Sequence, residues 1–190
     1  MKIRDSGMPE RAFWESLFDV PGMMTVLGVG RVIGSAIEVG CGYGTFTVPI
    51  ATRISGTLHS FDIDPAMVAA TEVRVCDAGL LNVRLSARDV IADGFGLPAE
   101  TVDAVFLFNI LHAEDPVTLM RASAQVLRRD GKLFVVHWRS DVATPRGPDL
   151  AIRPRPEQVA SWAAETALLA TDGGARLLPP WHFGVVFIRQ

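Results

Sequence analysis

Cysteine is scarce in this sequence of 190 residues, which contains only Cys41 and Cys76. Two cysteines form neither a disulfide framework nor the paired knuckles of a structural zinc site. We therefore expect a reducing, cytoplasmic compartment and no bound metal.

An excess of positive charge is also missing. The 18 Lys and Arg residues are outnumbered by 21 Asp and Glu residues, the net charge is -3, and no basic run with interleaved aromatics occurs. Proteins that bind double-stranded nucleic acid normally carry a basic surface. The charge balance therefore argues against such a partner.

Long hydrophobic runs are absent too. The apolar stretches 20–34 and 102–111 are interrupted by charged residues, proline or glycine, whereas a membrane-spanning helix needs about 20 apolar residues. The N-terminal segment carries charges from Lys2 to Asp19 where a signal peptide would have its apolar core. We expect neither a membrane span nor export.

The remaining composition is that of one folded domain, with 49% hydrophobic and 21% charged residues. Short apolar runs predict strands at 35–39, 57–61, 82–85, 102–108 and 132–138. Helix-compatible segments lie between them at 45–54, 65–75 and 116–127, and residues 8–19 form an amphipathic pattern. Strands that alternate with helices indicate a doubly wound α/β fold, a parallel sheet covered on both faces.

The C-terminal part follows a different pattern. Five prolines and glycines in residues 142–156 predict a loop, 157–170 reads as a helix, and strands follow at 175–178 and 184–189. The last two strands are too close for a crossover helix, so they must be antiparallel. We expect four parts in one domain: a helical cap (1–30), a core (31–138), a proline-rich loop (139–157), and a helix with a closing strand pair (158–190).

Residues 36–45 carry the most informative motif, Ala-Ile-Glu-Val-Gly-Cys-Gly-Tyr-Gly-Thr. Glycine allows positive φ and has no Cβ, so this turn lets backbone N–H groups approach a ligand at a helix N-terminus. A tight turn without a ligand would have the same residues. The dinucleotide fingerprint G-x-G-x-x-G does not fit, because Thr45 stands where its last glycine would be.

This motif resembles motif I, E/D-x-G-x-G-x-G, of class I S-adenosylmethionine-dependent methyltransferases. The resemblance covers roughly residues 8–138 and is nearest to small-molecule enzymes such as the ubiquinone/menaquinone C-methyltransferase-like group. It implies S-adenosylmethionine as the cofactor. It also implies a Rossmann-like sheet of seven strands in the order 3-2-1-4-5-7-6, mostly parallel with an antiparallel last strand. One departure is the connection 88–101, whose glycines and proline leave little room for a full helix.

The resemblance also assigns residues. Asp62 would accept hydrogen bonds from the ribose hydroxyls, Ile63 would pack on the adenine, and Asp89 would meet the adenine amino group. The cofactor-binding residues it implies are Glu38, Gly40, Cys41, Gly42, Tyr43, Gly44, Asp62, Ile63, Asp89, Val90 and Asn109. The alternatives are a helix N-cap for Asp62, as for Asp64, and an ordinary surface turn for Asp89.

Methyl transfer from a sulfonium is an in-line displacement, which requires alignment in a dry pocket and a base only when the acceptor must lose a proton. His112, His137 and Asn109, near strand ends, are the catalytic candidates, and a role as ordinary loop or core residues stays open for both histidines. His182 is a further candidate with the same alternative. Arginines in 139–157 could bind an anionic substrate or be solvated, and Trp14 and Phe18 are candidate pocket walls.

We therefore expect an enzyme that methylates a small molecule at O, N or C, as a monomer or homodimer. One alternative is a protein or RNA methyltransferase, although Asn109-Ile-Leu-His does not match the N/D-P-P-Y/F tetrad that amino-methylating enzymes often carry. A second alternative is a non-catalytic module that binds an adenosine cofactor. A nicotinamide-dependent oxidoreductase is disfavoured by Thr45.

Overall fold

The computed structural model describes residues 8–30 and 33–190. The strands are β1 (Ala36–Val39), β2 (Leu58–Asp62), β3 (Val83–Ala87), β4 (Val102–Phe108), β5 (Leu127–Trp138), β6 (Leu169–Thr171), β7 (Arg176–Leu178) and β8 (His182–Arg189). The helices are α1 (Arg11–Glu15), α2 (Val20–Leu27), α3 (Thr47–Ala51), α4 (Pro65–Asp77), α5 (Pro116–Val126), the 3-10 turn η1 (Leu150–Ile152) and α6 (Pro156–Glu165).

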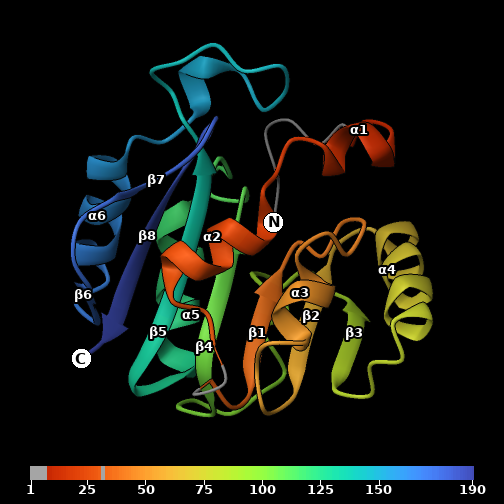
Figure 1. The fold of residues 1–190 in the computed structure, drawn as a ribbon. Helices are drawn as coiled ribbons and strands as arrows, with labels where there is room; N and C mark the ends of the chain where they lie inside the picture. The colour runs from red at the N-terminus through yellow and green to blue at the C-terminus, as the bar shows by residue number, and fades with distance from the viewer. Residues whose placement is uncertain (1–7, 31–32) are drawn as a thin grey trace.

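A single twisted sheet organises the chain (Figure 1), with the strand order β3-β2-β1-β4-β5-β8-β6 and β7 paired to β8. β1 to β5 run parallel, and β8 is antiparallel to β5, β6 and β7. The predicted doubly wound α/β fold, its parallel core and its antiparallel end are confirmed.

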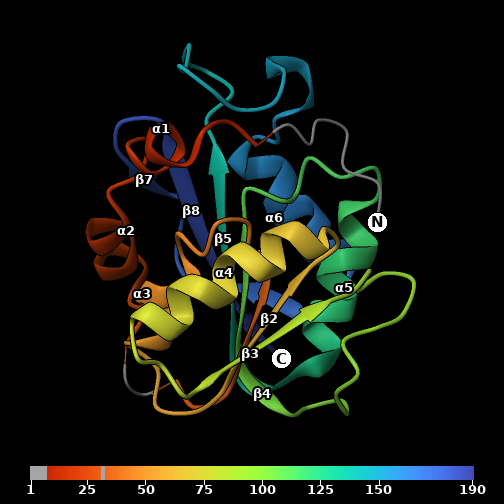
Figure 2. The same cartoon turned by 90° about the vertical axis from the view of Figure 1, so that its right-hand side faces the viewer.

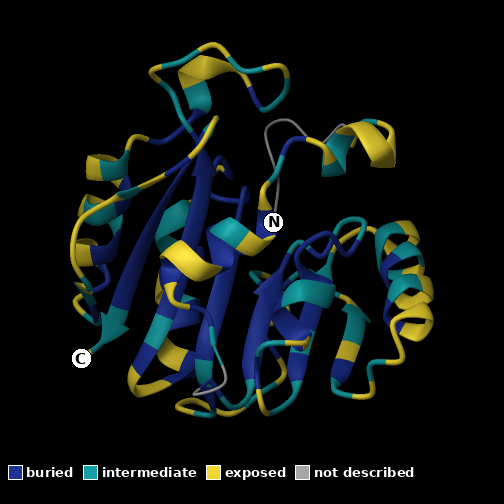
Figure 3. Ribbon diagram, in the orientation of Figure 1, coloured by how far each residue is buried: buried dark blue, intermediate teal, exposed yellow. Residues whose placement is uncertain are grey.

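Two apolar cores lie on the two faces of the sheet. In Figure 2, α2 and α3 lie on one side and α5 and α6 on the other. Alternate residues of β4 enter different cores: Val105 and Leu107 pack with α5, whereas Phe106 and Phe108 pack with α2 and α3. Strands buried on both faces explain why 102–108 is a continuous apolar run, and they are the darkest part of Figure 3.

The C-terminal helix is shorter than predicted. Residues 157–170 were expected to be helical, but α6 ends at Glu165 and Ala167 has a φ of 57°. This left-handed residue terminates the helix, and Leu169 then pairs with Arg189 of β8. With the added strand β6, the sheet of the described residues has eight strands where seven were expected.

The N-terminal helix was also predicted wrongly. Residues 8–19 were expected to form one helix, but α1 covers only Arg11–Glu15, and a separate helix, α2, begins at Val20 with its own N-cap. The carboxylate of Asp19 accepts a hydrogen bond from the backbone N–H of Gly22, and Pro21 occupies the first turn of α2. An acidic cap followed by proline starts a new helix, and this signal at Asp19 was missed.

The other differences are at element ends. The helix expected at 45–54 spans only Thr47–Ala51, and the strand expected at 132–138 begins at Leu127, which pairs with Val102 before an irregularity in the ladder. The connection 88–101 consists of turns, as its glycines predict. Within the described ranges, no helix is both long enough and apolar enough to cross a membrane.

Candidate functional site

The glycine-rich turn follows β1 at the carboxyl edge of the parallel sheet, where open α/β sheets bind their ligands. The backbone N–H groups of Gly40 and Cys41 both donate to the carbonyl of Phe61, at 2.7 and 3.1 Å, which ties the turn to β2. Gly42 has a φ of 53°, which residues with a Cβ rarely adopt. Gly40 has a φ of 82°, so this position also favours glycine.

Asp62, the last residue of β2, connects the two loops at this edge. Its Oδ2 accepts a hydrogen bond of 2.9 Å from the N–H of Gly42, and its Oδ1 accepts one of 3.0 Å from the N–H of Asp64. The N-cap of α4 is Asp64, whose carboxylate accepts from the N–H of Ala66 at 2.8 Å. The N-cap alternative therefore applies to Asp64, and Asp62 remains at the cavity.

Glu38, in β1, precedes the glycine-rich turn and does not line the cavity described in the next paragraph. It is buried, and its Oε2 accepts hydrogen bonds of 2.6 Å from the hydroxyls of Thr47 and Ser60. Burial raises the pKa of Glu38 to about 7, although both hydroxyls oppose this shift. Through these hydrogen bonds Glu38 links β1 to α3 and to β2, and it thereby supports the turn.

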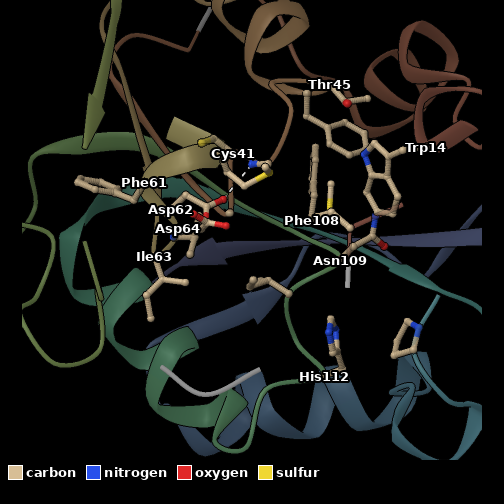
Figure 4. Close-up of a pocket in the computed structure, with 18 of the residues that line it drawn as sticks. Trp14, Cys41, Thr45, Phe61, Asp62, Ile63, Asp64, Phe108, Asn109 and His112 are labelled. Atoms are coloured by element: carbon tan, nitrogen blue, oxygen red, sulfur yellow. Dashed lines mark hydrogen bonds between the residues drawn. The ribbon is translucent and has the colours of Figure 1, made fainter. Parts of the chain in front are cut away.

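A cavity of about 320 Å³ opens beside the turn and Asp62. Figure 4 shows Phe61, Asp62, Ile63 and Asp64 at one end, and Trp14, Phe108, Asn109 and His112 at the other. The predicted residues that line it are Gly40, Cys41, Gly42, Asp62, Ile63, Asp89, Val90, Asn109, His112 and Trp14. The predicted residues Glu38, Tyr43, Gly44, His137 and Phe18 are not part of its lining.

Tyr43 and Gly44 have other contacts. The hydroxyl of Tyr43 donates to the carbonyl of Pro9 at 2.9 Å, which holds the N-terminal segment over the turn. Gly44 packs against α4, where an added Cβ would lie 3.1 Å from Thr71. Tyr43 and Gly44 therefore stabilise the turn and the N-terminal segment from outside the cavity.

Two buried polar groups of residues that line the cavity have no hydrogen-bond partner among residues 8–30 and 33–190. These are the side-chain amide of Asn109 and the hydroxyl of Thr45. Asn109 follows β4 directly and has a φ of 56°. Because buried polar atoms are nearly always paired, these two groups can bind a polar atom of a ligand or a water molecule.

The three candidate histidines occupy different positions relative to the cavity. His112 lines the cavity, and the fully buried His137 stands behind it, with 3.4 Å between His112 Nδ1 and His137 Nε2. His182 begins β8, where it is buried between the rings of Phe18 and Trp138 at centroid distances of 4.7 and 4.1 Å. His182 does not line the cavity.

The arginines of the proline-rich loop also differ in whether they line the cavity. Arg146 lines the cavity. Arg153 is buried in the loop, where it donates to the carbonyls of Pro148 and Arg139 at 2.7 and 3.0 Å and lies over the ring of Trp138. Arg153 therefore stabilises the loop through hydrogen bonds and does not line the cavity.

Sequence reasoning missed part of the wall. The further lining residues include Met8, Val39, Phe46, Phe61, Asp64, Met67, Arg88, Phe108, Ile110, Trp138, Gly147 and Pro148. Several of these follow strand ends, which was the available signal. Asp89 combines two roles, because its carboxylate also accepts from the N–H groups of Ile91 and Ala92, as a turn aspartate does.

Known proteins resemble this chain in sequence. It is 28% identical over 100 residues to an aklanonic acid methyltransferase of Streptomyces sp. (strain C5), covering 51% of this chain and 44% of that one. It is 26% identical over 168 residues to a ubiquinone biosynthesis O-methyltransferase of Xanthomonas axonopodis pv. citri (strain 306), covering 77% of this chain and 67% of that one. The chain thus spans less than half of the first relative.

Solved structures share the fold. A SAM dependent methyltransferase from Aquifex aeolicus superposes with a TM-score of 0.82 at 20% identity, over 95% of this chain and 94% of that one. A geranyl diphosphate methyltransferase in complex with SAM gives 0.72 at 14% identity, over 97% and 93%. The predicted resemblance is confirmed.

The sequence profile of a family described as "Methyltransferase domain" matches residues 36–131, from the first residue of β1 to the start of β5. This segment holds the glycine turn, Asp62, Asn109 and His112. The chain therefore belongs to the methyltransferase domain family.

Proposed function

We propose that this chain transfers a methyl group from S-adenosylmethionine to a small-molecule acceptor. The observation that carries this proposal is the 2.9 Å hydrogen bond between the N–H of Gly42 and Asp62, which brings a glycine turn and a carboxylate together at one end of the cavity. The named activities of the relatives support the same reaction.

The residues at this end fit the cofactor. A carboxylate such as Asp62 can accept hydrogen bonds from both ribose hydroxyls, because it offers several lone pairs. Ile63, which is 49% exposed although it lines the cavity, offers an apolar surface to the adenine, and Asp89 and Val90 line the same cavity. The amide of Asn109, which has no partner within the part of the chain that the structure describes, suits a hydrogen bond to a polar atom of the occupant. When bound, the cofactor supplies a methyl group on a positively charged sulfur.

The other end of the cavity suits an acceptor with an aromatic or other large apolar body. Trp14, Phe46, Phe108 and Trp138 provide ring surfaces there, and Arg146 adds a guanidinium. Such walls exclude water and orient the acceptor. Charge disperses as the methyl group moves from a cation to a neutral acceptor, so the chain's contribution is alignment in a dry site.

Calorimetry tests the cofactor assignment. We expect the chain to bind S-adenosylmethionine and its demethylated product, and not a nicotinamide dinucleotide. An assay for the demethylated product with phenols, carboxylic acids and amines then identifies the acceptor class. Binding of the dinucleotide alone would overturn the proposal, and cofactor binding without turnover of any acceptor would favour the non-catalytic module.

We also propose a cytoplasmic monomer or homodimer that does not bind double-stranded nucleic acid. The free thiols of Cys41 and Cys76 support a reducing compartment, and the net charge of -3 opposes nucleic acid binding. Burial raises the pKa of the Cys41 thiol, which keeps it protonated and unreactive. Light scattering after gel filtration determines the oligomeric state, and a gel-shift assay tests DNA and RNA.

A further inference from the structure

A buried arginine closes the loop that follows β5. Residues 139–155 leave the carboxyl edge of the sheet and stand at the top of Figure 1. Arg153 belongs to this loop and is only 8% exposed. Its Nε donates to the carbonyl of Pro148 at 2.7 Å, and its Nη1 donates to the carbonyl of Arg139 at 3.0 Å. One guanidinium thus joins the start, the middle and the end of the loop.

These contacts hold the charge of Arg153 in a buried place. Burial disfavours the charged form and lowers the pKa of Arg153, although Asp149 opposes this shift. The two carbonyls offset the cost of burial, because hydrogen bonds from a charged donor are roughly twice as strong as neutral ones. The ring of Trp138 adds a further contact, with its centroid 5.9 Å from the guanidinium carbon. Arg153 therefore keeps the loop in one conformation, although connecting loops are usually mobile.

The segment that Arg153 holds is part of the cavity wall. Arg146, Gly147 and Pro148 line the cavity, as Trp138 does. Gly147 packs against the ring of Trp138, because an added Cβ would lie 3.0 Å from the ring atoms Cγ and Cδ2. The φ of Gly147 is 121°, which favours glycine. We call residues 146–148 the roof of the cavity.

The roof lies at the end of the cavity that suits the acceptor. The ring of Trp138, which the roof contacts, lies 6.3 Å from the ring of Trp14. Figure 4 shows Trp14 with Phe108 and Asn109 at the end opposite Asp62. A displaced roof should therefore affect the acceptor more than the adenosine part of the cofactor.

We propose that Arg153 is a positioning residue for the acceptor: it holds the roof against Trp138, and the roof sets the size of the acceptor that the cavity admits. This inference rests on the proposed methyl transfer. Arg153 does not line the cavity, so it acts through residues 146–148. Because a loop that is already ordered need not be ordered on binding, Arg153 lowers the KM for the acceptor.

Limited proteolysis tests the position of the roof without any acceptor. Trypsin cuts after arginine unless proline follows, so in this loop it can cut after Arg139 and Arg146 and not after Arg153 or Arg155. Arg153→Met keeps a long unbranched side chain, removes both donors and changes no cleavage site. We expect the bond after Arg146 to be cut about 5- to 30-fold faster in this variant, because cleavage follows the population of the open loop.

Three further variants separate the roof from general stability. Arg155→Met removes an exposed arginine that is also followed by proline, and it should be cut at the rate of the parent. Gly79→Ala strains the backbone at a residue outside the cavity lining, and it should also leave this cleavage rate unchanged. Arg153→Lys keeps the charge without the planar fork that reaches two carbonyls, so its rate should lie between those of the parent and Arg153→Met.

Kinetics test the effect on the acceptor that the product assay identifies. Arg153→Met should raise the KM for this acceptor about 10-fold, because binding must then order the roof, and kcat should change less than about threefold. The Kd for S-adenosylmethionine should not change. The variant should also discriminate less than the parent against an analogue of the acceptor enlarged by one fused ring. A merely structural role of Arg153 would lower stability and leave KM and this discrimination as they are.

Either of two results would overturn the inference. One is an Arg153→Met variant that trypsin cuts no faster than Arg155→Met. The other is an Arg153→Met variant that is cut faster but matches Gly79→Ala in KM and in discrimination by size. If Arg153→Met does not fold, Arg153→Lys serves for the same two comparisons. Failure of the proposed function would appear separately, as a parent chain whose roof resists trypsin but which binds no S-adenosylmethionine or methylates no acceptor.

Discussion

Asp62 and Gly42 are separated by 20 positions, yet the carboxylate of one accepts a 2.9 Å hydrogen bond from the backbone of the other. The second oxygen of Asp62 accepts from the N–H of Asp64. One side chain thus fixes both the turn after β1 and the loop after β2, and these two segments form one end of the cavity.

Replacing Asp62 should therefore weaken cofactor binding. In Asp62→Ala, two backbone N–H groups and the ribose lose an acceptor, and a hydrogen bond to a charged group contributes about 1.5–3 kcal/mol. We expect the Kd for S-adenosylmethionine to rise about 10- to 100-fold in calorimetry. Asp64→Ala should cost about 1 kcal/mol of stability through its lost N-cap, with a smaller effect on Kd. Equal effects on Kd would contradict the role of Asp62.

The Gly42 backbone provides a second prediction. Gly42→Ala and Gly79→Ala both place a side chain at positive φ, 53° and 63°, and should each lose about 1–2 kcal/mol of stability. An added Cβ at Gly79 meets nothing within 4 Å, so Gly79→Ala measures backbone strain alone. We expect only Gly42→Ala to lose cofactor affinity as well. Urea unfolding and calorimetry measure the two quantities, and similar Kd values in both variants would refute a binding role for the turn.

Glu38 should make stability depend on pH. Its pKa is raised to about 7 in the folded chain, because burial disfavours the carboxylate, whereas the reference value is 4.5. Between these values the folded state holds a proton that the unfolded state releases, so the unfolding free energy falls as pH rises through this window. The contribution is fully present below the lower value and is lost above the higher one.

The variant Glu38→Gln removes this titration and keeps an acceptor oxygen for Thr47 and Ser60. Relative to Glu38→Gln, the parent should lose a few kcal/mol of stability as pH rises through the window, on the basis of about 1.4 kcal/mol per pKa unit. Urea titrations across the range measure the difference. Glu72→Gln, at an exposed position of α4, is the control. A parent curve parallel to that of Glu38→Gln would mean that Glu38 is charged throughout.

Arg153 and Arg155 should differ although they are close neighbours. Arg153→Ala leaves the carbonyls of Pro148 and Arg139 without their donor and exposes the ring of Trp138, so we expect a loss of about 1–3 kcal/mol. Arg155 is exposed, and Arg155→Ala should stay within about 0.5 kcal/mol of the parent. Urea unfolding separates them. If Arg153→Ala changes KM for the acceptor and leaves stability intact, Arg153 contacts substrate instead.

The elements that could be predicted are those with strong local signals. The run 102–108 matches β4, and Pro65 correctly marks the start of α4, because a doubly buried strand is continuously apolar and proline suits a first helical turn. Elements set by long-range pairing were missed. β6 is a strand because Leu169 pairs with Arg189 of β8, and nothing near Leu169 in sequence indicates this.

The candidate site shows the same difference between residues with local signals and residues placed by long-range pairing. The glycine turn was predicted from residue type and spacing, which are local properties, and Asp62 was assigned through the family resemblance that this turn carries. His137 and Trp138 are adjacent on β5, and neighbouring strand residues point to opposite faces. Only the register of β5 in the sheet decides that Trp138 lines the cavity and that His137 stands behind His112.

The sequence by itself determined the α/β alternation, the turn that needs glycine and the methyltransferase resemblance, because hydrophobic period and backbone conformation depend on near neighbours. Only the tertiary structure decided which polar side chains meet. Asp62 joins Gly42, His137 contacts His112, and Arg153 is buried in its own loop, because strand order and packing bring together residues that are distant in the chain.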